Sequence, residues 1–124
     1  MKFTVDKVRN MKGKRKLVAI TSYDYPTAQI ADKSDVDIVL VGDSASMVMM
    51  GNKNTIPITL EEMLVFSKAV SKGVENALVV ADMPFMSYNL GIEKAVENAC
   101  RLVKEAGVDA VKIEGGVYMQ STAK

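Results

Sequence analysis

The side chains of this 124-residue chain that could do chemistry follow four apolar segments. These positions are held by Ser22-Tyr23-Asp24, Gly42-Asp43-Ser44, Asp82, and the pair Lys112 and Glu114. Carboxylates that follow three successive segments would repel one another if they converged without a cation. Oxygen ligands without histidine or cysteine suit Mg²⁺, which binds one or two carboxylates together with substrate oxygens. The pattern therefore predicts a magnesium site, with Lys112 placed to hold an anionic substrate.

Each of these residues also has a structural alternative. An Asp or Ser directly after a strand is often a helix cap or a turn former. Lys112 and Glu114 could pair with each other, because side chains two positions apart on a strand point the same way. Acids at equivalent positions after successive strands, with a lysine beside them, favour a shared site over separate caps. For Cys100, among apolar residues on a predicted helix, we expect an inert place in the core.

The elements that must position these residues alternate between strands and helices. Apolar runs rich in β-branched residues predict strands at 17–21, 36–41, 77–81 and 109–113. Helices are expected over Val5–Met11, from Tyr25 to about Lys33, after the Thr59-x-x-Glu62 capping box, and near Gly91–Ala106. A doubly wound sheet and part of a (β/α)₈ barrel both satisfy this order. Either architecture places the four strand ends on one face, where active sites are built.

The composition is typical of a globular domain and argues against several other classes of protein. The chain is 48% hydrophobic and 25% charged with a net charge of +1, which is typical of a soluble globular domain and gives no electrostatic case for nucleic acid. No apolar run approaches the roughly 18 residues that span a bilayer, so no membrane association is expected. A single cysteine and the absence of histidine exclude an intramolecular disulfide, a cysteine zinc cluster and histidine-based catalysis. The basic first 16 residues lack the apolar region of a secretory signal, and a cytoplasmic protein is expected.

Five motifs resemble those of the ketopantoate hydroxymethyltransferase (3-methyl-2-oxobutanoate hydroxymethyltransferase) family, in the family's order and with similar spacing. They are Tyr23-Asp24-Tyr25-Pro26, Val41-Gly42-Asp43-Ser44, Gly51 followed by Asn54-Thr55-Ile56-Pro57-Ile58-Thr59, Ala81-Asp82-Met83-Pro84-Phe85-Met86-Ser87-Tyr88, and Val111-Lys112-Ile113-Glu114-Gly115-Gly116. The resemblance covers essentially the whole chain. It implies an α/β fold, the (β/α)₈ TIM barrel of the phosphoenolpyruvate/pyruvate type, with only the first four strands present. Residues 1–124 would form a single domain, the N-terminal half of that barrel with a leading short helix.

The resemblance also implies an enzyme, a transferase of pantothenate and coenzyme A biosynthesis. It would move a hydroxymethyl group from 5,10-methylenetetrahydrofolate to 3-methyl-2-oxobutanoate, giving 2-dehydropantoate by Mg²⁺-dependent, aldol-type C–C bond formation. Matched motif by motif, Asp43, Asp82 and Glu114 would be the magnesium ligands. Ser44 and Lys112, with Asp43 and Asp82, would contact the keto acid. Full-length family members form large homo-oligomers, so a homo-oligomer is expected here.

The same resemblance leaves part of the enzyme unaccounted for. A (β/α)₈ barrel needs about 250 residues, and the family's general base at C3 and much of its folate pocket lie in the C-terminal half. No catalytic residue is therefore assigned in this chain. We expect a fragment of a longer enzyme, with a half-barrel completed by self-association and a chain without activity as alternatives. A C–C lyase like phosphoenolpyruvate mutase or isocitrate lyase, or a non-catalytic self-associating half-barrel, are the alternative functions.

Overall fold

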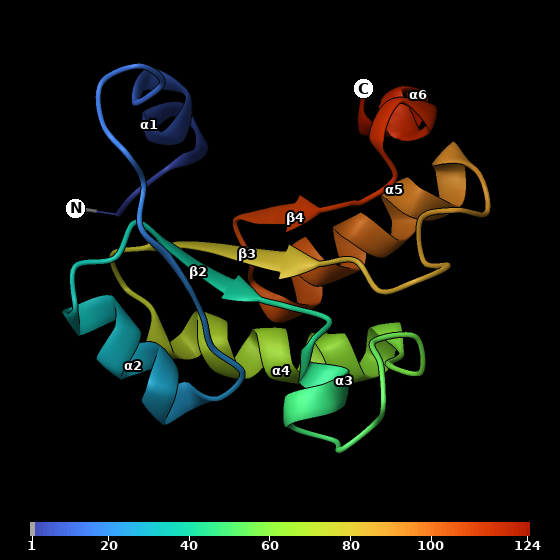
Figure 1. The fold of residues 1–124 in the computed structure, drawn as a ribbon, viewed down its shortest axis with the longest axis horizontal. Helices are drawn as coiled ribbons and strands as arrows, with labels where there is room; N and C mark the ends of the chain where they lie inside the picture. Colours follow the sequence, from blue (N-terminus) through green and yellow to red (C-terminus); the bar gives the residue numbers. More distant parts are fainter. Residues whose placement is uncertain (1) are drawn as a thin grey trace.

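Four parallel strands in consecutive order form the sheet of this protein, seen in a computed structural model that describes residues 2–124 (Figure 1). The strands are β1 (Ala19–Thr21), β2 (Ile38–Val41), β3 (Leu78–Asp82) and β4 (Ala110–Lys112), paired in the order β1-β2-β3-β4. A doubly wound sheet reverses its strand order at a switch point, whereas a (β/α)₈ barrel keeps the order of the sequence. The order therefore favours the barrel, and the four predicted strands are confirmed.

Helices precede the first strand, fill the intervals between the strands and follow the last strand. They are α1 (Val5–Asn10), α2 (Tyr25–Lys33), α3 (Ala45–Val48), α4 (Leu60–Gly73), α5 (Ile92–Arg101), the π-helical η1 (Leu102–Ala106), the 3₁₀ helix η2 (Gly116–Met119) and α6 (Gln120–Ala123). The predicted capping box is confirmed, because the Thr59 side chain and the Glu62 side chain each accept the backbone N–H of the other residue. The helix predicted near Gly91–Ala106 is α5 and η1 together, ended by left-handed Gly107. None of the helices within residues 2–124 combines the length and the hydropathy needed to cross a bilayer.

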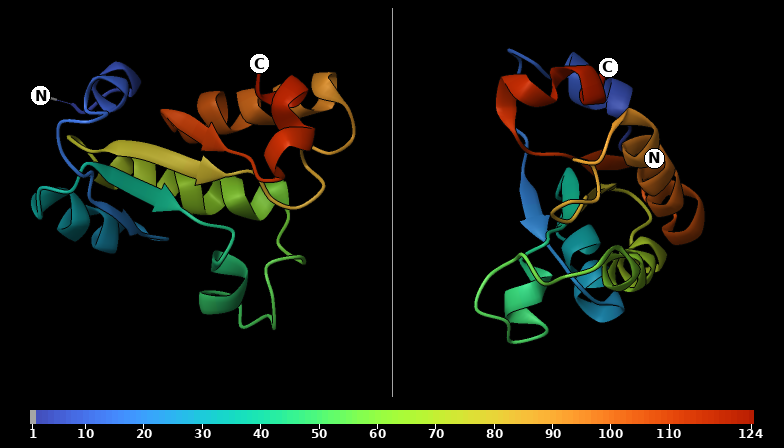
Figure 2. Two further views of the ribbon diagram at one scale, coloured as in Figure 1. Left: turned by 45° about the horizontal axis from the view of Figure 1, so that its top comes forward. Right: turned by 90° about the vertical axis from the view of Figure 1, so that its right-hand side faces the viewer.

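The core lies between one face of the sheet and helices α2 and α4, which run beneath the strands in Figure 1 and in the left view of Figure 2. Val39, Val41, Val79 and Ala81 are fully or almost fully buried there. Because side chains alternate along a strand, Leu40 and the residues in register with it point to the opposite face. On that face Leu40 and Val80 are only partly buried, so one side of the sheet is covered and the other is open.

Burial at the edges of the fold differs from the sequence expectation. The apolar run at residues 17–21 predicts a buried strand, but all three residues of β1 are exposed because β1 is an edge strand. The spacing of Val5 and Val8, one turn apart, predicts a buried inner face for the first helix, yet α1 contains no buried residue. Cys100, expected in the core, is exposed on α5. These segments have the predicted conformation but lack a layer packed against their outer side.

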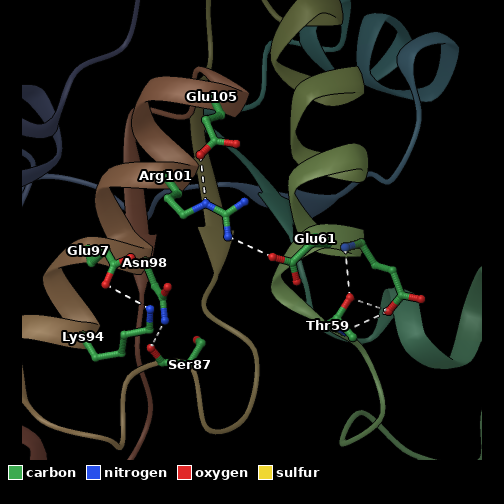
Figure 3. A network of polar contacts seen from close by, with 9 residues as sticks. Thr59, Glu61, Ser87, Lys94, Glu97, Asn98, Arg101 and Glu105 are labelled. Atoms are coloured by element: carbon green, nitrogen blue, oxygen red, sulfur yellow. Dashed lines mark hydrogen bonds and ion pairs between the residues drawn. The ribbon is translucent and has the colours of Figure 1, made fainter.

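The structure also contradicts one ion pair that the sequence predicts. The spacing of Glu97 and Arg101 predicts an i, i+4 pair on the exposed side of the helix. Arg101 instead contacts Glu61 of α4 at 2.9 Å and Glu105 at 2.8 Å, while Glu97 pairs with Lys94 (Figure 3). The neighbouring helix α4 supplies a carboxylate that the sequence of α5 alone does not reveal.

Three aspartates fix the N-terminal ends of the strands. Asp32 accepts the backbone N–H groups of residues 75–77, directly before β3. Asp37 accepts the N–H of Val18 and pairs with Arg15, and Asp109 accepts the N–H of Val79. Burial raises the pKa of the Asp32 carboxyl, but its backbone hydrogen bonds outweigh burial and the pKa is lowered overall. These acids therefore stabilise the sheet as carboxylates.

The Asp37 contacts predict a specific pH dependence of stability. Its hydrogen bond from Arg15 lowers the pKa of Asp37 from 3.8 to about 2, so its contribution is fully present above the unfolded pKa and is lost as pH falls through about 2. We expect Asp37→Asn to lower the free energy of unfolding by about 1–2 kcal/mol near neutral pH. The effect is kept small because the Arg15 side chain is 48% exposed and water screens its charge. Urea unfolding should show wild type and variant converging below the folded pKa. Asp35→Asn, at an exposed position with φ 57° that suits Asn, is the control that should change little. A constant gap between wild type and Asp37→Asn down to the lowest pH would contradict the prediction.

Candidate active site

The C-terminal ends of β2, β3 and β4 bring four of the predicted site residues together. Asp82, the last residue of β3, is in register with Lys112, the last residue of β4. The Lys112 Nζ lies 3.0 Å from Asp82 Oδ1 and 3.1 Å from Glu114 Oε1. The backbone N–H of Asp43, just after β2, donates to Asp82 Oδ2 at 3.2 Å. Asp82 is thus the centre of the group, 5% exposed and linked to residues of both neighbouring strands.

Ser44, the fifth predicted residue, is held at the edge of this group by a tyrosine. The Tyr23 hydroxyl and Ser44 Oγ lie 2.6 Å apart, joining the segments after β1 and β2. Gly42 leaves room for this arrangement. A Cβ at that position would stand 2.7 Å from Ser44 Oγ and 3.6 Å from Asp82 Oδ2. A side chain at position 42 would therefore displace the serine hydroxyl.

Sequence reasoning missed two tyrosines that hold site residues. Tyr23 contacts Ser44 as described, and the buried Tyr88 accepts the backbone N–H of Glu114 at 3.4 Å. Both tyrosines lie within the motifs that resemble the family, and this was the only sequence signal that could have identified them. A tyrosine near a strand end can equally be a packing residue, so the signal was not specific. Asp24, conversely, does not join the group. It caps α2 by accepting the Thr27 N–H at 2.8 Å, so the structural alternative holds for the acid after β1.

The electrostatics of the group reflect an excess of negative charge. Burial raises the pKa of the Asp43 carboxyl, and the nearby charges of Asp82 and Glu114 raise it further. Burial alone would lower the pKa of Lys112, but its contacts with Asp82 and Glu114 outweigh burial and raise it. Three carboxylates therefore face one ammonium group, which leaves two negative charges without a partner inside the group.

The donor set fits a divalent cation that keeps part of its shell for other oxygens. The carboxylate and hydroxyl groups of the site offer only oxygen ligands, and the buried Asp82 Oδ1 is contacted by the Lys112 ammonium group. Within residues 2–124, no three His, Cys, Asp or Glu side chains are arranged as a complete ligand set. An ion such as Mg²⁺ commonly binds one or two carboxylates and takes its remaining ligands from water and substrate. The residues present are suited to that incomplete kind of site.

Comparisons with known proteins agree on the family and the fold. Residues 2–124 match the model of the family described as ketopantoate hydroxymethyltransferase. The chain is 54% identical to the 3-methyl-2-oxobutanoate hydroxymethyltransferase of Nitrosopumilus maritimus, over 94% of this chain and 42% of that protein. It is 52% identical to the Pyrococcus furiosus protein of the same name, over 91% of this chain and 40% of that protein. The chain thus spans less than half the length of these curated relatives.

Two solved structures share the fold at low sequence identity. A phosphoenolpyruvate phosphomutase from Streptomyces platensis subsp. rosaceus aligns with a TM-score of 0.67 and 19% identity, over 89% of this chain and 37% of that one. A 2,3-dimethylmalate lyase of the PEP mutase/isocitrate lyase superfamily aligns with a TM-score of 0.68 and 17% identity, over 96% and 42%. The predicted fold class is confirmed: the four parallel strands correspond to part of a TIM-barrel fold.

The close approach at Gly42 predicts that Gly42→Ala breaks the hydrogen bond between Tyr23 and Ser44. The added Cβ displaces Ser44 Oγ, so we expect a loss of about 1 kcal/mol in the free energy of unfolding, the usual value of one such bond. Urea unfolding of Gly42→Ala, Tyr23→Phe and the double variant measures the coupling. Because both changes remove the same bond, the double variant should lose less than the two single losses added together. Strict additivity would show that Gly42 acts independently of this hydrogen bond.

Proposed function

Because the chain belongs to the ketopantoate hydroxymethyltransferase family, we propose that it binds 3-methyl-2-oxobutanoate together with Mg²⁺. The reaction it serves would be hydroxymethyl transfer from 5,10-methylenetetrahydrofolate to this keto acid, giving 2-dehydropantoate for pantothenate biosynthesis. One observation carries the proposal. Asp82, Lys112 and their neighbours converge at the C-terminal ends of three parallel strands, the face on which barrel enzymes build their active sites.

The proposed roles are those that the resemblance to the family implies for these residues. Asp43, Asp82 and Glu114 would hold Mg²⁺, which when bound supplies Lewis acidity to the keto acid's carbonyl group and makes its C3–H more acidic. Lys112 carries the positive charge that attracts the substrate carboxylate, and Asp82 and Glu114 hold its ammonium group in place. The Ser44 hydroxyl, positioned by Tyr23, would donate a hydrogen bond to the same substrate. The new bond joins C3 of the keto acid to the one-carbon unit of the folate.

Other parts of the proposal depend on segments outside this chain. The curated relatives are more than twice as long. No residue of this chain is therefore assigned as the base that takes the proton from C3, and no complete folate pocket is assigned to it. A single domain over residues 1–124, a homo-oligomeric assembly and a cytoplasmic location remain predictions. The solved structures support the fold alone, and a lyase-type reaction has no residue-level support comparable to the match with the transferase family.

Thermal unfolding with and without MgCl₂ and 3-methyl-2-oxobutanoate tests the proposal. Both ligands together should raise Tm, because ligand at one hundred times its Kd stabilises the folded state by about 2.7 kcal/mol. Asp82→Asn should abolish the shift, since Asp82 contacts both flanking strand ends. Asp24→Asn is the matched control: Asn caps a helix as well as Asp does, so this variant should keep the shift. An unchanged shift in Asp82→Asn, or no shift in a wild-type chain that unfolds cooperatively, would refute the proposed site.

A ligand comparison separates the transferase from the lyase alternative. The same measurement with pyruvate and with oxalate replaces the branched keto acid by smaller relatives of similar charge. A transferase site should respond most strongly to 3-methyl-2-oxobutanoate. An equal or larger response to oxalate or pyruvate would favour a lyase or mutase of the same superfamily.

A further inference from the structure

Glu114 lies just beyond the last regular hydrogen bond between β3 and β4. That bond runs from the backbone N–H of Met83 to the C=O of Lys112, at 2.9 Å. In a parallel ladder the next bond would run from the N–H of Glu114 back to the C=O of Met83. The N–H of Glu114 instead donates to the hydroxyl of Tyr88, at 3.4 Å. A side chain thus takes the place of the sheet at a residue proposed as a cation ligand.

This hydrogen bond is on the side of β4 that faces β3. The C=O of Lys112 and the N–H of Glu114 both bond toward β3 and the segment that follows it, residues 83–91. The contact therefore joins two neighbouring strands that are already paired in the structure. It does not involve the outer edge of β4.

The backbone around Glu114 has little regular structure to hold it. β4 ends at Lys112, and Glu114 is followed by Gly115 and Gly116, with φ angles of 131° and 60°. Glycines in this region of φ leave the backbone many conformations. The Glu114 side chain is largely exposed, and its carboxylate contacts the Lys112 ammonium group at 3.1 Å. A hydrogen bond to the Glu114 backbone therefore limits where this carboxylate can lie.

Tyr88 is itself held firmly in place. Its side chain is 7% exposed and packs in the core. The C=O of the preceding residue, Ser87, accepts from the buried Asn98 side chain of α5 at 2.7 Å (Figure 3). Ser87 Oγ in turn donates to the C=O of Pro84 at 2.7 Å. The segment that carries Tyr88 is therefore braced internally and tied to α5, which gives the Tyr88 hydroxyl a fixed position.

We propose that Tyr88 is a positioning residue, whose hydroxyl holds the backbone of Glu114 so that the Glu114 carboxylate stays beside Lys112 and within reach of the bound cation. This role rests on the proposed function, and Tyr88 acts through Glu114 rather than on the cation itself. Removal of a group that orients a metal ligand commonly weakens metal affinity by roughly 10–100-fold. Because Tyr88 acts on the backbone of one ligand, the effect should be near the lower end of that range.

Isothermal titration of MgCl₂ into the chain, at saturating 3-methyl-2-oxobutanoate, measures this effect. Tyr88→Phe keeps the buried ring and removes the hydroxyl, so it should raise the Kd for Mg²⁺ about tenfold. Tyr25→Phe is the matched control, because the Tyr25 hydroxyl accepts from Gln29 on the exposed side of α2, and its Kd should equal that of the wild type. An unchanged Kd in Tyr88→Phe would refute the positioning role alone. A wild-type chain that binds no Mg²⁺ would refute the proposed function, and the positioning role with it.

A double-variant cycle separates positioning from a general effect on the fold. In a Glu114→Gln background the ligand carboxylate is already absent, so Tyr88→Phe should change the Kd for Mg²⁺ by less than about twofold. A tyrosine that only stabilised the fold would weaken binding by the same factor in both backgrounds. Equal factors would therefore contradict the proposal.

Amide hydrogen exchange gives a readout that needs neither Mg²⁺ nor keto acid. A hydrogen-bonded N–H exchanges only when its bond opens, so Tyr88→Phe should speed exchange at the Glu114 amide about fivefold or more. The Val79 amide, which donates to Asp109 at the other end of β3, should keep its rate. Unchanged exchange at Glu114, or equal acceleration at both amides, would overturn the proposal. The hydrogen bond can thus fail this measurement while the proposed binding site holds.

Discussion

The site depends on the register between β3 and β4, which sets Asp82 directly beside Lys112. A slip of one residue would turn one of these side chains to the opposite face of the sheet. Contacts at the other end of the strands oppose such a slip. Asp109 accepts the N–H of Val79, and Asp32 holds the three residues before β3 through their backbone N–H groups. Acids at the N-terminal ends of the strands thus position the acids at the C-terminal ends.

The two sets of acids differ in the groups that surround their carboxylates. Asp32 is surrounded by backbone donors, and its pKa is lowered despite burial. Asp43 lies among other carboxylates and its pKa is raised, while the buried Asp82 Oδ1 is contacted by the Lys112 ammonium group. The crowding of negative charge, rather than residue type, separates a candidate ligand from a structural carboxylate here.

Sequence patterns predicted the conformation of the elements better than their surroundings. Hydrophobic periodicity located all four strands, and the capping box at Thr59 located the start of α4. Periodicity did not distinguish a doubly wound sheet from a barrel, because both require the same alternation of strands and helices. The family resemblance and the observed strand order favoured the barrel. Burial of β1 and α5 was overestimated, because an apolar face shows that a segment can be covered and not that a covering layer is present. Asp24 and Asp43 likewise look equivalent in sequence, and only their contacts separate a helix cap from a site residue.

Closure of the sheet edge and the chemistry of the site are linked through β4. Lys112 ends this edge strand, and Glu114, two residues later, is exposed. A strand paired with β4 would take Lys112 and Glu114 further from water, and charge interactions strengthen as the surrounding dielectric constant falls. The attraction of Lys112 for an anionic group would then increase, and so would the repulsion among the three carboxylates. The surplus negative charge is tolerable where water reaches the exposed Glu114. In a closed barrel it would have to be balanced by a bound cation, so closure and cation binding should favour each other.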